Sequence, residues 1–454
     1  MATDPMPDEA LSLPRRAADE GPWPAPIATE PVHATIVVPG SKSETNRALV
    51  LAALSDGPSR ISGGLEARDT RLMREGLRTL GVTIDDSTDD WLVTPPDGGF
   101  RGGGTIDCGL AGTVMRFLPP IAALADGPTH FVGDPEAEKR PMGPLLDALY
   151  DMGAEVSTDT DSLPFTVHGR PDLPGGPIRI DASGSSQFVS GLLLMGARCA
   201  RGLDVEHIGE TLPSRPHIDM TVAMLNEHGI RAFDEGGTRW CIEPSRIVAL
   251  DSVIEPDLTN AAVFLAAAVM TVGSVTVPGW PFETNQPGDR IRQILTDFGA
   301  EVRLDSDGLH VTGTMHPRGV DLDLSDASEL TPVVAALAAI AHQSSTIRGV
   351  GHIRGHETDR LAALEAELNE LGSATHQTED GLSIAPRMLH GGDWHTYADH
   401  RMAHAGALIG LIVDDVTLDD VTCTSKTLPD FPGMWRMMLE QSAVWSEQNV
   451  NGEA

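Results

Sequence analysis

The stretch VPGSKSETNR, residues 38–47, has the residue types of an anion-binding site. It is typical of a strand end, a Pro-Gly turn and a helix that begins at Ser41 or Ser43. The N-terminus of a helix offers unpaired N–H groups and a partial positive charge, and Lys42 and Arg47 add two full charges. The alternative is a capped surface helix with two solvated cations. The stretch is not a Walker A loop, because a serine separates its glycine from Lys42.

Two further loops of the first half place small residues or cations before a helix. In CGLAGTVMRF, residues 108–117, glycines that include Gly112 let a ligand approach the backbone closely. In GDPEAEKRPMGPL, residues 133–145, Arg140 carries a fork of donors that suits a phosphate or a carboxylate. The alternatives are a plain turn for the first loop and a solvated loop for the second.

Serines gather at another predicted helix start. The sequence SGSSQF, residues 183–188, brings three serines and Gln187 together, whereas a helix cap needs only one hydroxyl. Ser214, in PSRPH at residues 213–217, resembles this on a smaller scale. The surplus of hydrogen-bonding groups favours a polyol or a phosphate as ligand.

The second half adds acids, histidines and cations just before helices. Glu329 precedes a predicted buried helix, where a plain helix cap is the alternative. HIRGHETDRL, residues 352–361, is dense in charge, although internal ion pairs could explain it. His400 and His404 have a spacing compatible with a metal, but no third ligand accompanies them, so we expect no metal site. Lys426 lies in a loop near the C-terminus.

The charged candidates share one trait, which is that most precede or open helices far apart in the sequence. They are Lys42, Arg47, Arg140, Arg360, Arg401 and Lys426, with Glu329, Glu357 and His400. The chain has 66 acidic and 32 basic residues, a net charge of −34. In so acidic a protein, cations placed in this way favour one shared anion site. The same charge argues against nucleic acid or an anionic membrane as partner.

The remaining composition indicates an intracellular globular protein. The four cysteines form no CxxC pair and are expected to be reduced thiols. The longest apolar run, residues 261–272, is too short to span a bilayer. Residues 1–30 lack an apolar signal core, so we expect a disordered tail, and we expect a second, frayed tail over residues 443–454.

An internal repeat must position the candidates. Five times an amphipathic helix is followed by a glycine and then by a β-type segment. These glycines, Gly81, Gly153, Gly229, Gly299 and Gly372, are 72, 76, 70 and 73 residues apart. A glycine just after a helix fits the left-handed cap position. Each unit is longer than a solenoid repeat, which predicts compact α/β subdomains.

Helices that are apolar on every face alternate with the repeats. They are predicted at residues 187–197, 260–270, 331–341 and 401–412, and should be buried inside the subdomains. Glu255 and Pro256 interrupt the pattern near the middle and indicate a crossover between two halves.

These motifs resemble, together and in order, those of the 5-enolpyruvylshikimate-3-phosphate synthase family. They are PGSKSETNRAL, LAGTVMRF, EKRPMGPL, SGSSQF, PSRPHID, HETDRL, DHRMA and SKTLPDF, and the resemblance covers residues 33–438. It implies a transferase that moves the enolpyruvyl group of phosphoenolpyruvate to the 5-hydroxyl of shikimate 3-phosphate, by addition and elimination through a tetrahedral intermediate. The reaction belongs to the shikimate pathway toward chorismate and aromatic amino acids.

The resemblance also implies a fold and a setting. The fold is α/β (α+β), a two-domain inside-out α/β barrel with three βαβαββ-like subdomains in each domain. Residues 31–41 plus 255–442 would form one discontinuous domain, and residues 42–254 the other. We expect no cofactor, a cytoplasmic location and a monomer whose partners are the two small-molecule substrates.

The resemblance assigns roles residue by residue. Glu329 matches the general base, Glu357 a proton donor, and His400 a position that assists the chemistry. Lys42, which lies among cations, is a second candidate for the proton donor. Substrates would be bound by Lys42, Ser43, Arg47, Gly112, Arg140, Ser185, Ser186, Gln187, Ser214, Glu329, His356, Arg360, Arg401 and Lys426. Of these, Arg140 and Gly112 would bind phosphoenolpyruvate, and the serines with Gln187 would hold shikimate 3-phosphate.

Three positions depart from many family members, which indicates an actinobacterial-type variant. Many members have Asn at the position of Leu110, Asp at that of Glu329 and Lys at that of His356. Histidine can be neutral at pH 7, so we expect weaker electrostatic binding or altered pH dependence there. One alternative is the related transferase that acts on UDP-N-acetylglucosamine. That enzyme uses a loop cysteine, and Cys108 lies near a suitable loop. Another is an inactive anion-binding relative.

Overall fold

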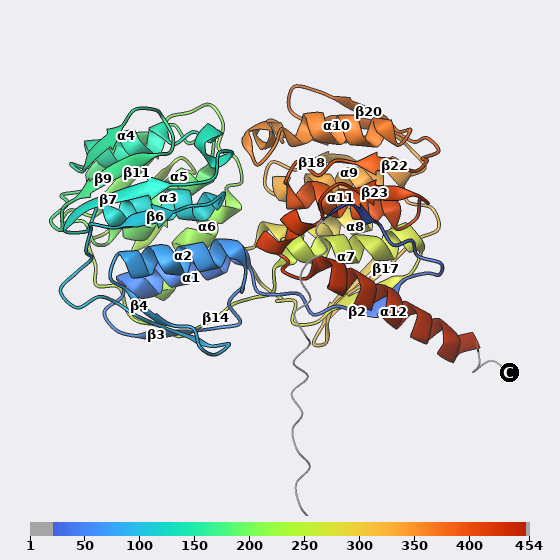
Figure 1. The fold of residues 1–454 in the computed structure, drawn as a ribbon, viewed down its shortest axis with the longest axis horizontal. Helices are drawn as coiled ribbons and strands as arrows, with labels where there is room; N and C mark the ends of the chain where they lie inside the picture. Colours follow the sequence, from blue (N-terminus) through green and yellow to red (C-terminus); the bar gives the residue numbers. More distant parts are fainter. Residues whose placement is uncertain (1–20, 451–454) are drawn as a thin grey trace, which may run out of the picture.

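The computed structural model describes residues 21–450, which form two lobes side by side (Figure 1). One hydrophobic core draws on residues 48–254. The other draws on residues 32–38 and 258–438. The described part of the chain therefore starts in the second lobe, crosses to the first and returns, as Figure 1 shows.

The first lobe contains three units with the strand order of a split βαβαββ motif, in which two parallel strands are followed by an antiparallel pair. The first unit is α1 (Lys42–Leu54), β3 (Ser59–Ser62), α2 (Arg68–Thr79), β4 (Thr83–Asp85) and β5 (Trp91–Thr94), completed by β14 (Ser252–Val253). The second is β6 (Thr105–Asp107), α3 (Gly112–Ala122), β7 (Gly127–Val132), η1 (Ala137–Lys139), α4 (Gly143–Asp151), β8 (Glu155–Thr158) and β9 (Phe165–Gly169). The third is β10 (Gly176–Ile180), α5 (Ser186–Gly196), β11 (Leu203–His207), α6 (Pro216–Glu227), β12 (Ala232–Asp234) and β13 (Arg239–Ile242).

The second lobe repeats the plan. Its first unit is β2 (His33–Thr35), α7 (Leu258–Thr271), β15 (Ser274–Val277), η2 (Pro287–Arg290), α8 (Ile291–Phe298), β16 (Glu301–Asp305) and β17 (Gly308–Thr312). Its second is β18 (Asp321–Asp323), η3 (Ser328–Leu330), α9 (Thr331–Ile340), β19 (Ser345–Arg348), η4 (Gly351–Gly355), α10 (Arg360–Glu370), β20 (Ala374–Gln377) and β21 (Leu382–Ala385). Its third is β22 (Gly392–Trp394), α11 (His400–Gly410), β23 (Val416–Leu418), η5 (Thr422–Lys426) and α12 (Phe431–Val450), with β1 (Trp23–Pro24).

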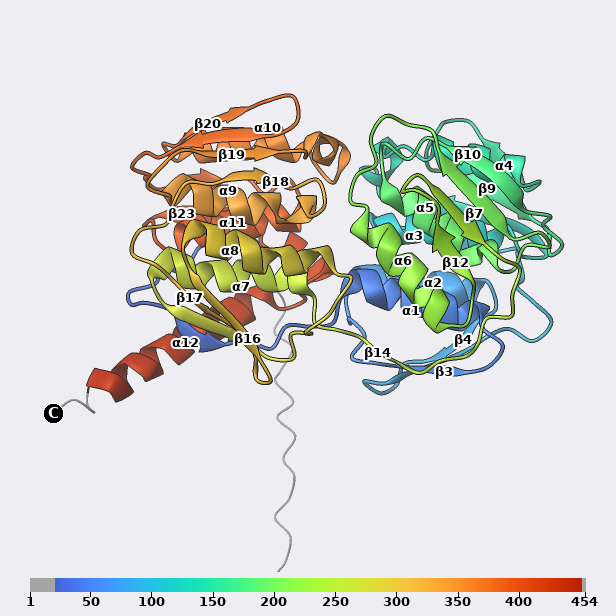
Figure 2. The ribbon, with the colours of Figure 1, turned by 180° about the vertical axis from the view of Figure 1, so that it is seen from behind.

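The predicted buried helices are present and form the centre of each lobe. Helices α1, α3 and α5 pack on one another in the first lobe, and α7, α9 and α11 do so in the second. Figure 2 shows the strands of the sheets, among them β10, β9 and β7, outside these helices. This arrangement confirms the predicted α/β fold with helices inside. The first turns of the central helices are where most of the candidate site residues lie.

The five repeat glycines have the conformation that their position requires. Each follows the second helix of its unit with φ between 78° and 100°, which favours a residue without a Cβ. The sixth unit has no such glycine because no hairpin follows α12. Its third strand is β1, which pairs antiparallel with β23.

Both predicted tails need correction. Trp23–Pro24 forms β1, and the N–H groups of Ala25 and Ala28 donate to the carbonyls of Val416 and Leu411, so residues 23–28 are not a disordered tail. Helix α12 continues to Val450, so residues 443–450 are helical and not frayed. Residues 1–20 and 451–454 lie outside the described range. Among the described helices, none combines the length and apolar content that crossing a bilayer demands.

The two crossovers between the lobes run beside each other. Gly40 forms an antiparallel bridge with Pro256. The Ser41 N–H donates to the Glu255 carbonyl at 2.8 Å, and the Asp257 N–H donates to the Pro39 carbonyl at 2.8 Å. This pair of segments leads directly into α1 and α7, so it fixes where those two helix N-termini meet.

Candidate active site

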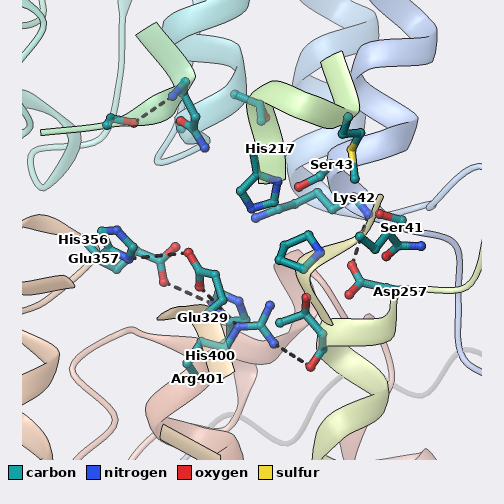
Figure 3. A pocket seen from close by; sticks show the side chains of 18 of the residues that line it. Ser41, Lys42, Ser43, His217, Asp257, Glu329, His356, Glu357, His400 and Arg401 are labelled. Carbon is teal, nitrogen blue, oxygen red and sulfur yellow. Dashed lines mark hydrogen bonds and ion pairs between the residues drawn. The ribbon is translucent and has the colours of Figure 1, made fainter. Parts of the chain in front are cut away.

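A cavity lies between the lobes and is lined by the N-terminal turns of central helices from both (Figure 3). Twelve of the predicted site residues line it: Lys42, Ser43, Gly112, Arg140, Ser185, Gln187, Glu329, His356, Glu357, Arg360, His400 and Arg401. Figure 3 shows Lys42, Ser43 and His217 on one side, and Glu329, Glu357 and Arg401 on the other. Residues far apart in the sequence are thus brought together at one site.

Helix α1 delivers the first cation. Ser41 is its N-cap and accepts from the Glu44 N–H at 3.4 Å. The N–H of Lys42 donates to Asp257 at 3.2 Å, and its Nζ lies 3.4 Å from Asp69. The ammonium group is therefore held beside the cavity by a carboxylate of the same lobe, within reach of an anion.

Arg47, which is predicted to bind substrate, is not among the residues that line the cavity. Its side chain is 1 % exposed and lies behind the first turn of α1. It donates to Thr221 Oγ1 at 2.7 Å, to the Ser43 carbonyl at 2.8 Å and to the His217 carbonyl at 2.9 Å. In this structure Arg47 fixes the backbone of two cavity residues, Ser43 and His217.

Arg140 crosses the N-terminus of α3. Its Nη1 donates to the Leu110 carbonyl at 3.2 Å. A Cβ placed on Gly112 would lie 3.1 Å from Arg140 Nη2 and 3.0 Å from Gln187 Oε1, so glycine is what lets these groups approach the helix. The buried Gln187 Oε1 has no hydrogen-bond partner within the described residues. Together they offer donors and an acceptor at the N-terminus of a helix.

The predicted serines divide into two groups. Ser185 lines the cavity and caps α5 by accepting from the Gln187 N–H at 3.2 Å. Ser186 and Ser214 are absent from the lining. The Ser214 hydroxyl instead lies 3.2 Å from that of Ser328, so it joins the first lobe to the second.

Glu329 and Arg360 form the centre of the second-lobe wall. Arg360 is 1 % exposed, its Nη1 lies 2.8 Å from Glu329 Oε2, and its Nε lies 2.7 Å from Asp399 Oδ2. Burial would raise the pKa of Glu329, but the guanidinium groups of Arg360 and Arg401 outweigh burial and hold that pKa well below its usual value. Glu329 is therefore ionised in this state.

Glu357 is surrounded by cations and an imidazole. Lys426 Nζ lies 2.6 Å from its Oε2 and His400 Nδ1 lies 3.1 Å from the same atom. Burial opposes ionisation, yet these neighbours hold the pKa of Glu357 well below normal. Burial also keeps the pKa of His400 well below its usual value despite Glu357. Lys426, absent from the lining, reaches the cavity through Glu357.

His356 is neutral at pH 7. Burial lowers its pKa to about 3, with Glu329 opposing and Arg360 assisting. Arg360 Nη1 lies 3.1 Å from His356 Nδ1, and because guanidinium can only donate, Nδ1 accepts and the proton resides on Nε2. His356 therefore offers a donor to a ligand, not a charge.

Sequence reasoning missed several cavity residues. His217, Thr259 and Gln286 line it, as does Asp257, which caps α7 through the Asn260 N–H. Asp257 follows the Glu-Pro step that indicated a crossover, and this step was the available signal. His217 follows a proline at the start of α6, but nothing in its spacing says that the ring points inward.

Glu357, Asp399 and His400 come close enough to one another to hold a metal ion. The same carboxylates already contact protein cations. Arg360 donates two hydrogen bonds to Asp399, and Lys426 forms an ion pair with Glu357. A divalent ion would have to displace a lysine and face a buried guanidinium. The donor set therefore fits an internal charge network better than a metal site.

Comparison with known proteins found a matching sequence family and similar solved structures. A sequence model of the family described as EPSP synthase (3-phosphoshikimate 1-carboxyvinyltransferase) matches residues 27–435. A solved EPSP synthase from Acinetobacter baumannii is similar over 93 % of this chain and 97 % of that chain, with a TM-score of 0.75 and 22 % identity. A second structure of that enzyme covers 93 % and 98 %, with a TM-score of 0.74 and 21 % identity. At these identities the solved structures support the fold alone.

Proposed function

The chain belongs to the EPSP synthase family, a family of 3-phosphoshikimate 1-carboxyvinyltransferases, and we propose that the interlobe cavity is the site where it performs this reaction. The observation that carries the proposal is the convergence of Lys42, Arg140, Arg360 and Arg401 on one cavity that also contains Glu329. Both substrates carry phosphate and carboxylate groups, so cations from both lobes are needed to hold them together against mutual repulsion.

Glu329 is our candidate for the base that accepts the proton of the 5-hydroxyl. As this proton leaves, the oxygen bonds to C2 of phosphoenolpyruvate while a proton is added to its methylene carbon. The intermediate then loses phosphate from C2 and a proton from the methyl group, which restores the double bond. Glu329 is ionised here, but its depressed pKa makes it a weak base until substrate anions engage Arg360 and Arg401. Substrate binding would thus activate the base.

Glu357 and Lys42 remain the candidates for the proton donor. The contacts favour Lys42, because Glu357 has given up its proton in the presence of Lys426 and His400. Glu357 and His400 would then orient Lys426 toward phosphoenolpyruvate. The cavity has about 100 Å³ of free space, below the usual few hundred of a ligand pocket, so these ion pairs must rearrange when substrates enter.

The alternative acceptor, a UDP-sugar, is not favoured. Cys108 is fully buried, and burial raises the pKa of its thiol to about 12, so it is no nucleophile or acid at the cavity. We further propose that the lobes are separate domains with boundaries near residues 41 and 255, and that the enzyme is a cytoplasmic monomer. The four free cysteines support a reducing compartment.

Phosphate release tests the function directly. We expect release only when shikimate 3-phosphate and phosphoenolpyruvate are both present, and none when either is omitted. Release with a UDP-sugar acceptor alone would reject the assignment. Sedimentation of the protein at assay concentration would test the monomer.

A further inference from the structure

Glu44 is a half-buried acid that the mechanism above does not use. It lies in the first turn of α1, two residues after Lys42, and is not among the residues that line the cavity. Its Oε2 accepts a hydrogen bond from the Glu255 N–H at 3.1 Å. A side chain of the first lobe is thus bonded to the backbone of the crossover that leads into α7.

Glu255, the residue that Glu44 contacts, is itself held by side chains of the second lobe. The Glu255 carboxylate accepts from Thr284 Oγ1 at 2.6 Å and from Gln286 Nε2 at 2.9 Å. The same Nε2 donates to the Pro256 carbonyl at 2.9 Å, and Gln286 lines the cavity. Glu44 therefore connects the helix turn that bears Lys42 to a network that reaches the opposite cavity wall.

The charges around Glu44 disfavour its ionised form. Glu255 faces it from the crossover and Glu227 from the end of α6, while Arg47 on α1 and the Glu255 N–H oppose them. Burial and the acidic neighbours raise the pKa of Glu44 to about 8. At pH 7 the group is an uncharged carboxylic acid, and above pH 8 it becomes a third negative charge in a crowded site.

We propose that Glu44 is a positioning residue for substrate binding, whose side chain joins the Lys42–Ser43 turn to the crossover of the opposite lobe. This inference rests on the proposed roles of Lys42 and Ser43. When Glu44 ionises, repulsion from Glu255 and Glu227 pushes the turn away from the crossover. Lys42 then no longer faces the anion held by the second lobe, and shikimate 3-phosphate binds more weakly.

Two substitutions separate charge from contact. Glu44→Gln keeps the size and the acceptor but cannot ionise, whereas Glu44→Ala removes the contact. Calorimetric titration with shikimate 3-phosphate from pH 6.5 to 9.5 measures binding without requiring turnover. With a pKa near 8, only about one tenth of wild-type Glu44 is protonated at pH 9, so we expect wild-type affinity to fall relative to Glu44→Gln there, with a limit of about tenfold that is reached when the ionised form does not bind.

At pH 7 Glu44→Gln should bind like wild type, and Glu44→Ala should bind more weakly at every pH. Glu75→Gln, an exposed acid-to-amide change on α2, is the matched control and should keep the wild-type profile. Identical pH profiles for wild type and Glu44→Gln would overturn the proposal, as would wild-type affinity in Glu44→Ala. If the wild type binds shikimate 3-phosphate normally but releases no phosphate, the proposed catalytic roles are wrong and the positioning role of Glu44 is unaffected. A wild type that binds no shikimate 3-phosphate would overturn both.

Discussion

Arg360 Nη1 lies 2.8 Å from Glu329 Oε2, so the proposed base is paired with a buried guanidinium before any substrate arrives. The same guanidinium is fixed by two bonds to Asp399, which is fully buried. The pairing keeps Glu329 ionised but lowers its basicity. A ligand that draws Arg360 or Arg401 toward its own charge would raise the basicity of Glu329 just when the hydroxyl is in place.

Glu329→Gln should separate binding from chemistry. The amide keeps the size and one acceptor, so affinity for shikimate 3-phosphate should change little. Loss of a proton acceptor should lower kcat about 100-fold or more. Calorimetry for binding and phosphate release for turnover check the two parts, and unchanged turnover would remove Glu329 from its role.

Arg140→Ala should weaken phosphoenolpyruvate much more than shikimate 3-phosphate. Arg140 crosses the N-terminus of α3, and removing a charge-assisted donor there should cost about 2 kcal/mol, or ~30-fold in affinity. Isothermal titration with each substrate measures the difference. Equal weakening of both substrates would mean that Arg140 supports the cavity as a whole.

How far the sequence predicted this site depends on the kind of signal. Helix N-termini are marked by caps and prolines, so most of the cations at those positions were found. The direction of a side chain leaves no such mark, and Arg47 points into the core although its motif neighbour Lys42 does not. Asp257 and Gln286 were missed because their role depends on the two crossovers lying side by side.

In the fold, too, features with a local sequence pattern could be predicted and long-range features could not. Five glycines with left-handed φ ended five helices and could be read from spacing alone. The sixth unit is completed by β1, which pairs Trp23 with Leu418 across most of the chain. Such long-range strand pairing has no local pattern, and the short segment before residue 31 looked like a tail for this reason.

Gly112→Ala should raise the KM for phosphoenolpyruvate several-fold. The added methyl group would lie 3.0 Å from Gln187 Oε1 and 3.1 Å from Arg140 Nη2, so both groups must shift by a few tenths of an ångström. Overpacking of this kind costs about 1–2 kcal/mol. Gly143→Ala is a matched control, because Gly143 also opens a helix but its Cβ would meet nothing closer than 3.5 Å. Steady-state kinetics should show normal values for the control, and equal effects would contradict the steric account.

His356→Gln should make stability less sensitive to acid. Burial lowers the pKa of His356 to about 3 from an ordinary 6.5, so between these values the unfolded chain binds a proton that the folded protein does not. Its contribution to stability is therefore complete above pH 6.5 and is lost as the pH falls toward 3. The limiting slope is about 1.4 kcal/mol per pH unit. The true slope is smaller, because the side chain is 20 % exposed.

Urea unfolding at pH 7.5, 6 and 5 measures this slope. Wild type should lose about 1 kcal/mol more than His356→Gln between pH 6 and 5, because only wild type carries the imidazole that must stay unprotonated when folded. His376→Gln, at a side chain that is 79 % exposed, is the matched control and should follow wild type. Parallel curves for wild type and His356→Gln would mean that the folded and unfolded chains bind this proton equally, so that the pKa of His356 is not lowered by the surroundings of Arg360.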